Sequence, residues 1–278
     1  MRSIALIVIN YNCPELTVEF CKSVRNISKD LNITIAVTDN SGCFAKAQGL
    51  SMHQFIKQCN INIYNPGVNL GYFPGAAFAY DSLTAGGYQP DFVIVANPDI
   101  SFPDTSFFSK LVNKQYPADV LAIGPSIQHG VGSKHSDQNP MKIRRLSVRG
   151  MYIRKFIYRY RTLSIANSAL AALRFRLRTK TNASPQLRPV YMIHGSFMIF
   201  TRRFFDETAG LKFPSFLYGE EIFVAEEVMR VNKTILHDPS LEVIHSGGRT
   251  TSLIKKSHQD RYIGNSIEIL YDRYFASI

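Results

Sequence analysis

Three sets of acidic residues in this sequence could carry out chemistry together. Asp39 and Asp99 each follow a short apolar run, and Glu220 and Glu221 are adjacent at the start of a helix-like stretch. A carboxylate can accept a hydrogen bond from a ring N–H, bind a divalent cation or take a proton from a hydroxyl group. Taken singly, each of these residues is also an ordinary turn former or helix-capping acid. Whether the fold brings them together therefore decides between the two interpretations.

Polar clusters follow three apolar runs of the sequence. The runs cover residues 4–9, 33–38 and 92–96, and the clusters after them are Asn10-Tyr11-Asn12, Asp39-Asn40 and Asn97-Pro98-Asp99. Parallel strands would bring these clusters to one edge of a sheet, where open α/β sheets bind ligands. We interpret this edge as a cradle for a nucleotide sugar. Asp39 would accept a hydrogen bond from the imide N–H of uracil or thymine, and Asp99 would bind a divalent cation that bridges the two phosphates.

A glycine-containing loop enters a predicted helix at residues 71–84. We expect its backbone N–H groups, together with Asn69 and Gly71, to approach the sugar nucleotide. The loop is not a P-loop, because no Gly-Lys-Ser/Thr follows, and it lacks the G-x-G-x-x-G spacing of the dinucleotide-binding fold. Alone, such a loop is more often structural than functional.

Glu220 and Glu221 are the strongest candidates for catalysis. Inverting displacement at an anomeric carbon needs a carboxylate that takes the acceptor hydroxyl's proton on the face opposite the leaving diphosphate. Adjacent like charges raise one pKa, which suits a base. We expect Glu226 and Glu227 on the solvated face of the same helix. The alternative is a helix start whose acids only complement the helix dipole.

The order of apolar runs and helix signals predicts an α/β fold with a mostly parallel sheet. We expect strands at residues 4–9, 33–38, 61–64, 92–96, 121–125 and 190–200, and helices at 15–28, 50–58 and 71–84. With 278 residues, of which 45% are hydrophobic, the chain can bury a large core. This composition excludes a disordered or collagen-like protein.

The net charge of +11 is concentrated in one segment. Between Asp137 and Asp206 the chain has 15 of its 32 basic residues and no acidic residue, so the rest has 17 basic and 21 acidic residues. Residues 151–160 and 163–177 alternate apolar and basic residues, which is typical of a cationic amphipathic helix on an anionic membrane. Nucleic acid is a competing ligand, although no nucleic-acid module surrounds the segment. A lid whose arginines close over the donor diphosphate is a third possibility.

The cysteines and the apolar runs indicate a cytoplasmic protein. Cys13, Cys21, Cys43 and Cys59 match no metal or redox spacing, so we expect reduced thiols. The short apolar start has no cleavage site of a signal peptide, and no run is long enough to span a membrane. We therefore expect a cytoplasmic protein that binds peripherally to the inner face of a membrane.

These motifs, in this order, resemble a family 2 glycosyltransferase. The matching strings are IALIVINYN, VTDNSG, NPGVNLGYFPGA, FVIVANPDI, HGSFMIFTRRFFDETAGL, FPSFLYGEEIFVAEEV and PSLEVIHSGG. The resemblance covers residues 4–125 and 190–275 and leaves the basic segment unmatched. Asn-Pro-Asp at the metal position is similar to bacterial rhamnosyltransferases that build surface polysaccharides.

The resemblance implies a GT-A fold: a Rossmann-like, mostly parallel sheet with helices on both faces, an acceptor-side subdomain and a basic helical insertion. It divides the chain into a nucleotide-sugar half (1–125), a membrane- or acceptor-facing insertion (126–189) and an acceptor-binding, catalytic half (190–278). Asp99 takes the place of the last Asp of the family's D-x-D motif, and Asn97 replaces its first carboxylate. His245 matches a family histidine near the diphosphate, where it would be a metal ligand or a phosphate contact, and His194 lines the cleft. The family's usual pair at the catalytic position is Glu-Asp with the second residue as base, so the resemblance places Glu221 first and Glu220 second. The implied cofactor is Mn2+ or Mg2+.

The implied reaction is inverting transfer of a sugar from a UDP- or dTDP-sugar to a saccharide, most simply a lipid-diphosphate-linked one in polysaccharide or O-antigen synthesis. The residues expected to bind the nucleotide sugar are Asn10, Tyr11, Asn12, Asp39, Asn69, Gly71, Asn97 and His194. Two alternatives stay open at this point. A nucleotidyltransferase would release pyrophosphate from a nucleoside triphosphate, and a non-catalytic phosphate- or lipid-binding protein would not need Glu220 and Glu221.

Overall fold

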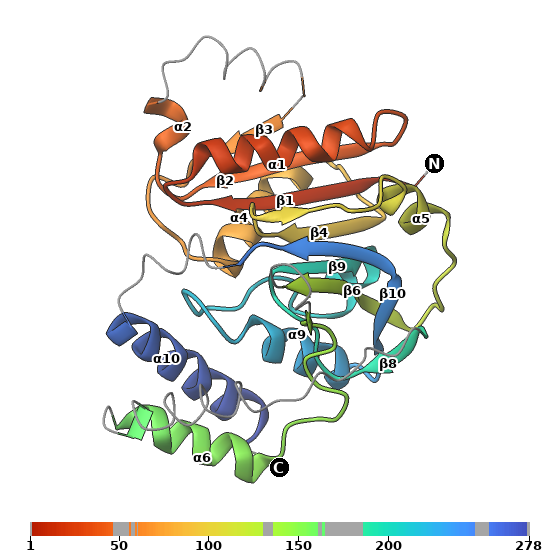
Figure 1. Ribbon diagram of the computed structural model, residues 1–278. Helices are drawn as coiled ribbons and strands as arrows, with labels where there is room; N and C mark the ends of the chain where they lie inside the picture. The colour runs from red at the N-terminus through yellow and green to blue at the C-terminus, as the bar shows by residue number, and fades with distance from the viewer. Residues whose placement is uncertain are drawn as a thin grey trace.

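The computed structural model describes residues 2–46, 56, 59, 61–129, 136–160, 163–164, 186–247 and 256–276. A single sheet crosses the molecule, with helices on both of its faces (Figure 1). The predicted helix at 50–58 lies outside the described residues except for position 56, and so does the predicted helix at 163–177 beyond position 164.

The sheet has ten strands among the described residues, and its main path runs β3-β2-β1-β4-β9-β6-β10-β5. The strands are β1 (Ile4–Asn10), β2 (Ile33–Asp39), β3 (Ile61–Tyr64), β4 (Phe92–Ala96), β5 (Ile100–Ser101), β6 (Val120–His129), β7 (Ser136–Asp137), β8 (Arg188–Val190), β9 (Phe197–Thr201) and β10 (Thr234–His245). β1, β2, β3 and β4 are parallel, as are β6 and β10, whereas β9 lies antiparallel between β4 and β6. The predicted α/β fold with a mostly parallel sheet is confirmed.

The sheet is buried on both faces because alternate residues of its strands enter two separate cores. Ala5 and Ile7 of β1 join one core, while Ile4, Leu6 and Val8 join the other. The helices are α1 (Pro14–Asn26), α2 (Cys43–Lys46), α4 (Phe73–Thr84), α5 (Phe107–Asn113), α6 (Val148–Arg159), α8 (Arg202–Glu207), α9 (Glu220–Arg230) and α10 (Lys256–Tyr274). α1 and α5 cover one face, and α4, α8 and α9 cover the other. Because helices cover both faces of the sheet, the sequences of its central strands are continuous apolar runs.

The predicted strand at 190–200 is wrong in one respect. β8 ends at Val190 and β9 begins at Phe197, and the chain between them crosses the carboxyl edge of the sheet. Phe197 pairs with Ala96, the last residue of β4. Because β9 is antiparallel to β4, the residues before β9 and those after β4 lie at the same edge.

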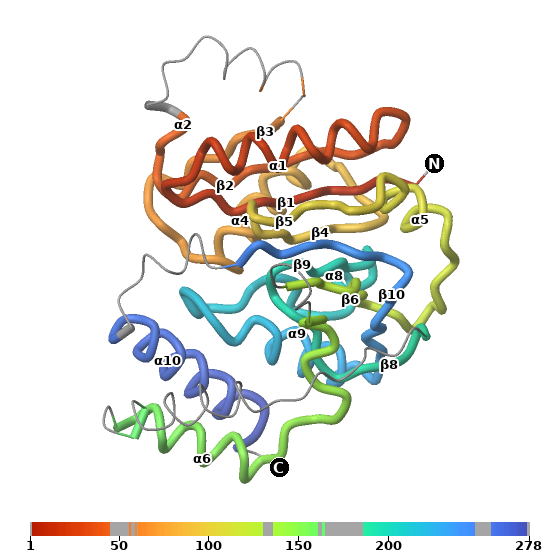
Figure 2. Tube along the Cα trace, in the orientation of Figure 1, coloured from red at the N-terminus to blue at the C-terminus, as the bar shows by residue number. Residues whose placement is uncertain are grey.

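α6 and α10 form an antiparallel pair below the sheet (Figure 2). The Lys155 ammonium lies 2.6 Å from the Asp272 carboxylate at one end of the pair, and the Ser164 hydroxyl donates to Asp260 near the other. Within the described residues, no helix is both long and apolar enough to cross a membrane. All four cysteines are free thiols.

Gly71 fixes the entry to α4, which begins at Phe73 and not at the predicted residue 71. Its φ of +88° is strained for an L side chain, and a Cβ there would overlap the carbonyl of Phe216. The Tyr72 N–H donates to the same carbonyl at 2.9 Å, so the two backbones touch.

Gly71→Ala is expected to destabilise the protein by about 2 kcal/mol or more, because it adds a backbone clash to the strain at positive φ. Gly67→Ala is the matched control. Gly67 also has a positive φ, of +76°, but a Cβ there meets nothing within 4 Å. It should lose only about 1 kcal/mol. Urea unfolding of both variants measures the difference in their free energies of unfolding. Equal losses of stability would show that the contact with Phe216 does not contribute to stability.

Candidate active site

Asn10 and Asp39 lie opposite each other at the carboxyl ends of β1 and β2. The Asn10 side-chain amide donates to Asp39 Oδ1 at 2.9 Å, and the Thr17 hydroxyl donates to Asn10 Oδ1 at 3.0 Å. The Phe44 N–H donates to Asp39 Oδ2 at 2.8 Å. Burial raises the pKa of Asp39, but the hydrogen bonds from Phe44, Asn10 and Ser41 outweigh it and hold that pKa below its ordinary value. Asp39 is therefore a buried carboxylate that stays charged at neutral pH.

Tyr11 and Asn12 form the exposed rim beside this pair. The Tyr11 side chain is exposed, and Asn12 has a φ of +54° in the left-handed region. The Asn12 N–H donates to the Ser41 hydroxyl at 3.1 Å, which ties the rim to the loop after β2. Both side chains are therefore free to meet a ligand at this edge.

The glycine loop is tied to the same edge by Asn40, a residue outside the predicted set. Its side-chain amide donates to the carbonyl of Gly71 at 2.8 Å and accepts from the Leu70 N–H at 3.2 Å. Asn69 is exposed and accepts from the Gly71 N–H at 3.0 Å. The loop thus lies next to the end of β2, and the link that holds it there joins residues 31 positions apart. Its approach to a sugar nucleotide stays a prediction.

Asp99 and His245 face each other across the end of β10. Their nearest atoms, Asp99 Oδ1 and His245 Nε2, are 3.4 Å apart. Asp99 Oδ1 is buried and has no hydrogen-bond partner among the described residues. His245 Nδ1 lies 3.0 Å from Gln138 Oε1, so Nδ1 carries the proton when the ring is neutral and Nε2 presents a lone pair. Two facing acceptors with nothing between them favour a cation at that place.

Two further histidines surround His245. The His194 and His129 rings lie 5.8 and 5.9 Å from it, centroid to centroid, and His129 Nδ1 is 2.9 Å from the carbonyl of His245. Burial, followed by the neighbouring histidines, lowers the pKa of His194 to about 4, so His194 is neutral at physiological pH. His129 and Gln138 are not predicted as site residues, because only the pairing of β6 with β7 and β10 brings them here.

Asp99 and His245 are the pair that could hold a divalent cation. Oxygen and imidazole ligands suit Mn2+. Among the residues that the structure describes, no group of three or more His, Cys, Asp or Glu side chains is placed to hold a metal ion. A cation here would therefore need further oxygen ligands from a bound substrate.

Glu220 and Glu221 begin α9 immediately after Gly219, which has a φ of +89°. The Gly195 N–H donates to Glu221 Oε1 at 3.3 Å. Glu220 is buried and its Oε1 has no partner among the described residues. Burial, and then the charge of Glu221, raises the pKa of Glu220 to about 8, and burial also raises the pKa of Glu221.

Tyr72 connects the glutamate pair with Asp99. Its hydroxyl donates to the carbonyl of Gly195 at 2.7 Å. Burial, followed by the charges of Glu220, Glu221 and Asp99, raises the pKa of Tyr72 well above its usual range. Asn97, whose N–H donates to the Ser196 carbonyl at 2.9 Å, joins the end of β4 to the same loop. The metal-site candidates and the base candidates therefore converge on residues 194–196.

Asp39 belongs to the same edge. The Asn10 amide that binds it also donates to Cys43 Sγ at 3.0 Å. Burial raises the pKa of the thiol of Cys13, which precedes α1. Asp39 ends β2, Asp99 follows β4 and Glu221 is bound by the Gly195 N–H. That these three carboxylates share one cleft stays a prediction.

The placement expected for Glu226 and Glu227 is wrong, because both side chains are buried. The Arg145 guanidinium binds Glu226 through two nitrogens, at 3.0 and 2.7 Å. Glu227 accepts from the Tyr274 hydroxyl at 2.6 Å and pairs with Arg273 at 3.0 Å. These partners come from the basic segment and α10, and they fix the far side of the helix that begins with Glu220.

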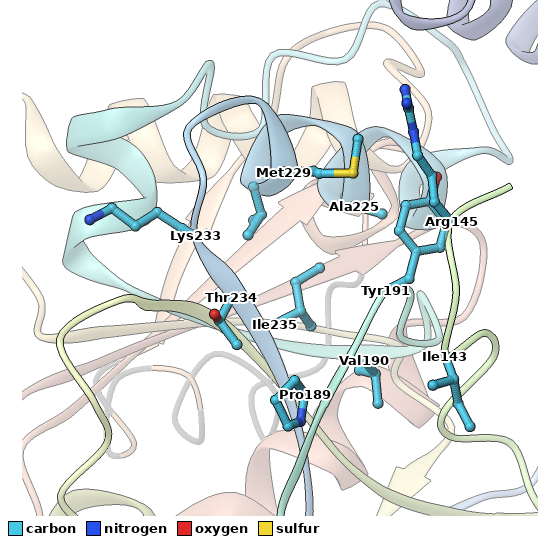
Figure 3. A pocket seen from close by; sticks show the side chains of 11 residues that line it. Ile143, Arg145, Pro189, Val190, Tyr191, Ala225, Met229, Lys233, Thr234 and Ile235 are labelled. Atoms are coloured by element: carbon cyan, nitrogen blue, oxygen red, sulfur yellow. The ribbon is translucent and has the colours of Figure 1, made fainter.

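A groove near Arg145 lies away from the predicted site residues (Figure 3). Val190 of β8, Ile235 of β10 and Met229 of α9 line it with Arg145 and Tyr191. None of the predicted nucleotide-sugar, metal or base residues reaches it, so the groove is distinct from the carboxyl edge.

Comparisons with known proteins agree with this geometry. The chain is 26% identical over 223 residues to N-acetylglucosaminyl-diphospho-decaprenol L-rhamnosyltransferases of two Mycobacterium tuberculosis strains, and the match covers 77% of this chain and 68% of the relative. No protein-family model matches the chain.

Two solved structures share the fold. A Pyrobaculum calidifontis mannosyltransferase in complex with GDP-Man and Mn2+ aligns with 90% of this chain and 58% of its own, at a TM-score of 0.50 and 13% identity. GalNAc-T7 with UDP, GalNAc and Mn2+ aligns with 89% of this chain and 44% of its own, at a TM-score of 0.56 and 12% sequence identity. This chain thus spans about half the length of those proteins. The fold is GT-A, and the sequence is similar to that of a rhamnosyltransferase.

Proposed function

We propose that this protein transfers a sugar, with inversion, from a UDP- or dTDP-sugar to a lipid-diphosphate-linked saccharide. One observation carries the proposal: the Asp99–His245 pair and Glu221 converge on residues 194–196 at the carboxyl edge of the sheet. The name of the Mycobacterium tuberculosis relative supports rhamnose as the sugar and a diphosphate-linked N-acetylglucosamine as the acceptor.

Asp39 is the residue proposed to recognise the base of the donor. Its Oδ1 accepts from Asn10 and Ser41, whereas Oδ2 accepts only from the Phe44 N–H among the described residues. A carboxylate oxygen has two lone pairs, so Oδ2 retains one for the imide N–H of uracil or thymine. Asn10 fixes the carboxylate, and Tyr11 and Asn12 lie at the rim where the nucleotide would enter.

Asp99 and His245 are proposed to hold a divalent cation, Mn2+ or Mg2+, against the donor diphosphate. A cation held there would neutralise charge that develops on the leaving diphosphate. Gln138 orients the His245 ring, and the neutral His194 adds no positive charge that would compete with the cation. Both solved neighbours contain Mn2+, which supports this assignment.

Glu221 is proposed as the base. The acceptor hydroxyl would give its proton to Glu221 as its oxygen bonds to the anomeric carbon, and the bond from that carbon to the diphosphate oxygen breaks on the opposite face. Glu221 is partly exposed and its Oε1 is oriented by the Gly195 N–H. Glu220 is more deeply buried, and its raised pKa keeps it protonated at neutral pH, so it does not compete for the proton.

We also propose that the outer face of α6 rests on an anionic membrane. Tyr152, Phe156 and Tyr160 follow one another at intervals of four residues, and their side chains are 57%, 49% and 47% exposed. Ile153 continues this apolar stripe. The exposed basic residues of the helix are Arg149, Arg154 and Arg159. An exposed aromatic stripe flanked by arginines suits the boundary between lipid headgroups and acyl chains.

The opposite face of α6 packs on the protein. Met151 is fully buried, and Lys155 pairs with Asp272 of α10. The helix is therefore held against α10, where the Tyr152 ring also lies 5.9 Å from the Tyr271 ring, while the stripe remains exposed to solvent. This arrangement supports a peripheral position at the inner face of the plasma membrane.

Glu221→Gln is expected to lower kcat for sugar transfer by roughly 10²–10⁴-fold while donor binding stays unchanged, since only the proton acceptor is lost. Transfer would be followed by release of nucleoside diphosphate from UDP- and dTDP-sugars, with an N-acetylglucosaminyl diphosphate lipid as acceptor. Chelation with EDTA should stop the wild-type reaction and added Mn2+ should restore it.

Asp99→Asn serves as the second variant of this assay, and its Mn2+ requirement should rise well above that of wild type. Nucleoside triphosphate consumption with pyrophosphate release would refute the proposal. A full rate of the Glu221→Gln variant would remove Glu221 from the mechanism.

Replacing Phe156 and Tyr160 together by Ser is expected to reduce binding to vesicles that contain phosphatidylglycerol by at least about tenfold. Wild-type binding should weaken in high salt and on vesicles of phosphatidylcholine alone. Co-sedimentation measures both. Lys29→Gln, an exposed change just beyond α1, should bind as wild type does. If the wild-type protein does not co-sediment with anionic vesicles, α6 is not a membrane-binding helix.

The raised pKa of Glu220 predicts that stability depends on pH. In the unfolded chain Glu220 loses its proton near its ordinary pKa, but the folded protein keeps the proton until about pH 8. The folded state binds more protons in this interval, so the free energy of unfolding should fall as pH rises, by up to about 1.4 kcal/mol per unit. Glu220→Gln should flatten this dependence in denaturant unfolding, whereas Glu268→Gln, on an exposed part of α10, should not.

A further inference from the structure

A hollow that no predicted site residue lines opens between residues 214–216 and α10. Its volume is about 380 Å³, which is enough for a sugar ring. We call it the α10 hollow, and its lining residues are Pro214, Ser215, Phe216, Arg261, Tyr262, Asn265 and Ile269.

The wall of the α10 hollow is joined directly to the candidate active site. The Phe216 carbonyl accepts from the Tyr72 N–H at 2.9 Å, and the Tyr72 hydroxyl donates to the carbonyl of Gly195. The N–H of Gly195 binds the proposed base, Glu221. Phe216 also lies only three residues before Gly219, where α9 begins. A molecule in the hollow would therefore sit beside the residues that surround the base.

The wall is also held rigidly in place. The Ser266 hydroxyl, on the inner side of α10, donates to the Leu217 carbonyl at 2.9 Å and contacts the Ser215 hydroxyl. Gly219 packs against Ser266 and Leu270 so closely that a Cβ would lie 2.9 Å from the Leu270 side chain. The shape of the hollow thus does not depend on a ligand.

The side chains of the hollow have the chemistry of a site for a phosphorylated sugar. The Phe216 and Tyr262 rings lie 4.8 Å apart at an angle of 37°, and they give an apolar surface for the C–H face of a sugar. The exposed Arg261 guanidinium lies 5.6 Å from the centre of the Tyr262 ring and forms no ion pair with any described residue. Asn265 adds an exposed amide that can bind hydroxyl groups.

We propose that the α10 hollow binds the acceptor, with its sugar on Phe216 and Tyr262 and its diphosphate at Arg261. An unpaired arginine is well suited to phosphate, since its planar fork can donate two hydrogen bonds to one group. This inference rests on the proposed transfer reaction and names the acceptor class: a saccharide on a diphosphate, not a neutral glycoside.

The position of α6 agrees with such an acceptor. Tyr158 of α6 contacts Gly264 of α10, and Ser164 binds Asp260, the neighbour of Arg261. The end of the exposed stripe at Tyr160 therefore lies near the diphosphate end of the hollow. A lipid tail that leaves the diphosphate would meet the membrane face of α6.

The test compares two acceptors: N-acetylglucosaminyl diphosphate with a farnesyl chain, and octyl N-acetylglucosaminide, which has no phosphate. Arg261→Gln should raise KM for the first acceptor by about tenfold and leave the second unchanged. Tyr262→Leu should raise KM for both. Donor KM and donor hydrolysis without acceptor should not change in either variant. Lys29→Gln removes an exposed positive charge far from α10 and should behave as wild type.

Calorimetric titration of the farnesyl compound into each protein separates this inference from the proposed function. One outcome is that wild type binds the compound, Arg261→Gln binds it about tenfold more weakly, and no donor gives transfer. This outcome would support the α10 hollow as the binding site and refute the proposed transfer reaction. If wild type transfers sugar and Arg261→Gln keeps an unchanged acceptor KM, the hollow is not the acceptor site. Failure of wild type to bind the compound, or an equal rise of donor KM, overturns the inference as well.

Discussion

The candidate active site depends on the peptide unit of Gly195, because both of its polar groups are used. Its N–H orients the Glu221 carboxylate, and its carbonyl accepts from the Tyr72 hydroxyl. A Cβ at this position would lie 2.8 Å from Glu221 Oε1, so only glycine lets the carboxylate approach the backbone this closely. The next residue, Ser196, binds Asn97 at the end of β4. One loop thus sets the base, the aromatic residue behind it and the strand that precedes Asp99.

Much of the fold could be predicted from the sequence, because the central strands are buried on both faces. β3 and β4 match their predicted bounds, and β1 extends its prediction by one residue, since continuous apolar runs closed by polar turns leave few alternatives. The break between β8 and β9 was not predictable in this way. Residues 191–193 are apolar like a strand, but they lead to the His194-Gly195-Ser196 loop, which is held by Asn139, Glu221 and Asn97, all distant in sequence. The division of the chain at residues 125 and 189 stays a prediction.

The same distinction applies to the site. Asp39 and Asp99 could be placed from the sequence because each follows a predicted strand, and parallel strands end at one edge. Glu221 begins a helix, and its position beside Gly195 depends on a contact 26 residues away. His129, Gln138 and Tyr72 carry no local signal, since their roles come from partners 107 to 123 residues away. The burial of Glu226 and Glu227 could not be predicted either, because Arg145 and Arg273 approach from distant segments. The described part of the basic segment likewise divides its charges: Arg145 and Lys155 are used inside the fold, while Arg149, Arg154 and Arg159 stay exposed.

The position of β9 limits how the protein can move. This strand belongs to the second half of the sequence, yet it pairs with β4 of the first half on one side and with β6 on the other. A hinge that opened one half against the other would have to break the ladder between β4 and β9 along five residue pairs in the middle of the sheet. The two halves of the sequence therefore share one continuous sheet and cannot swing apart as two separate lobes.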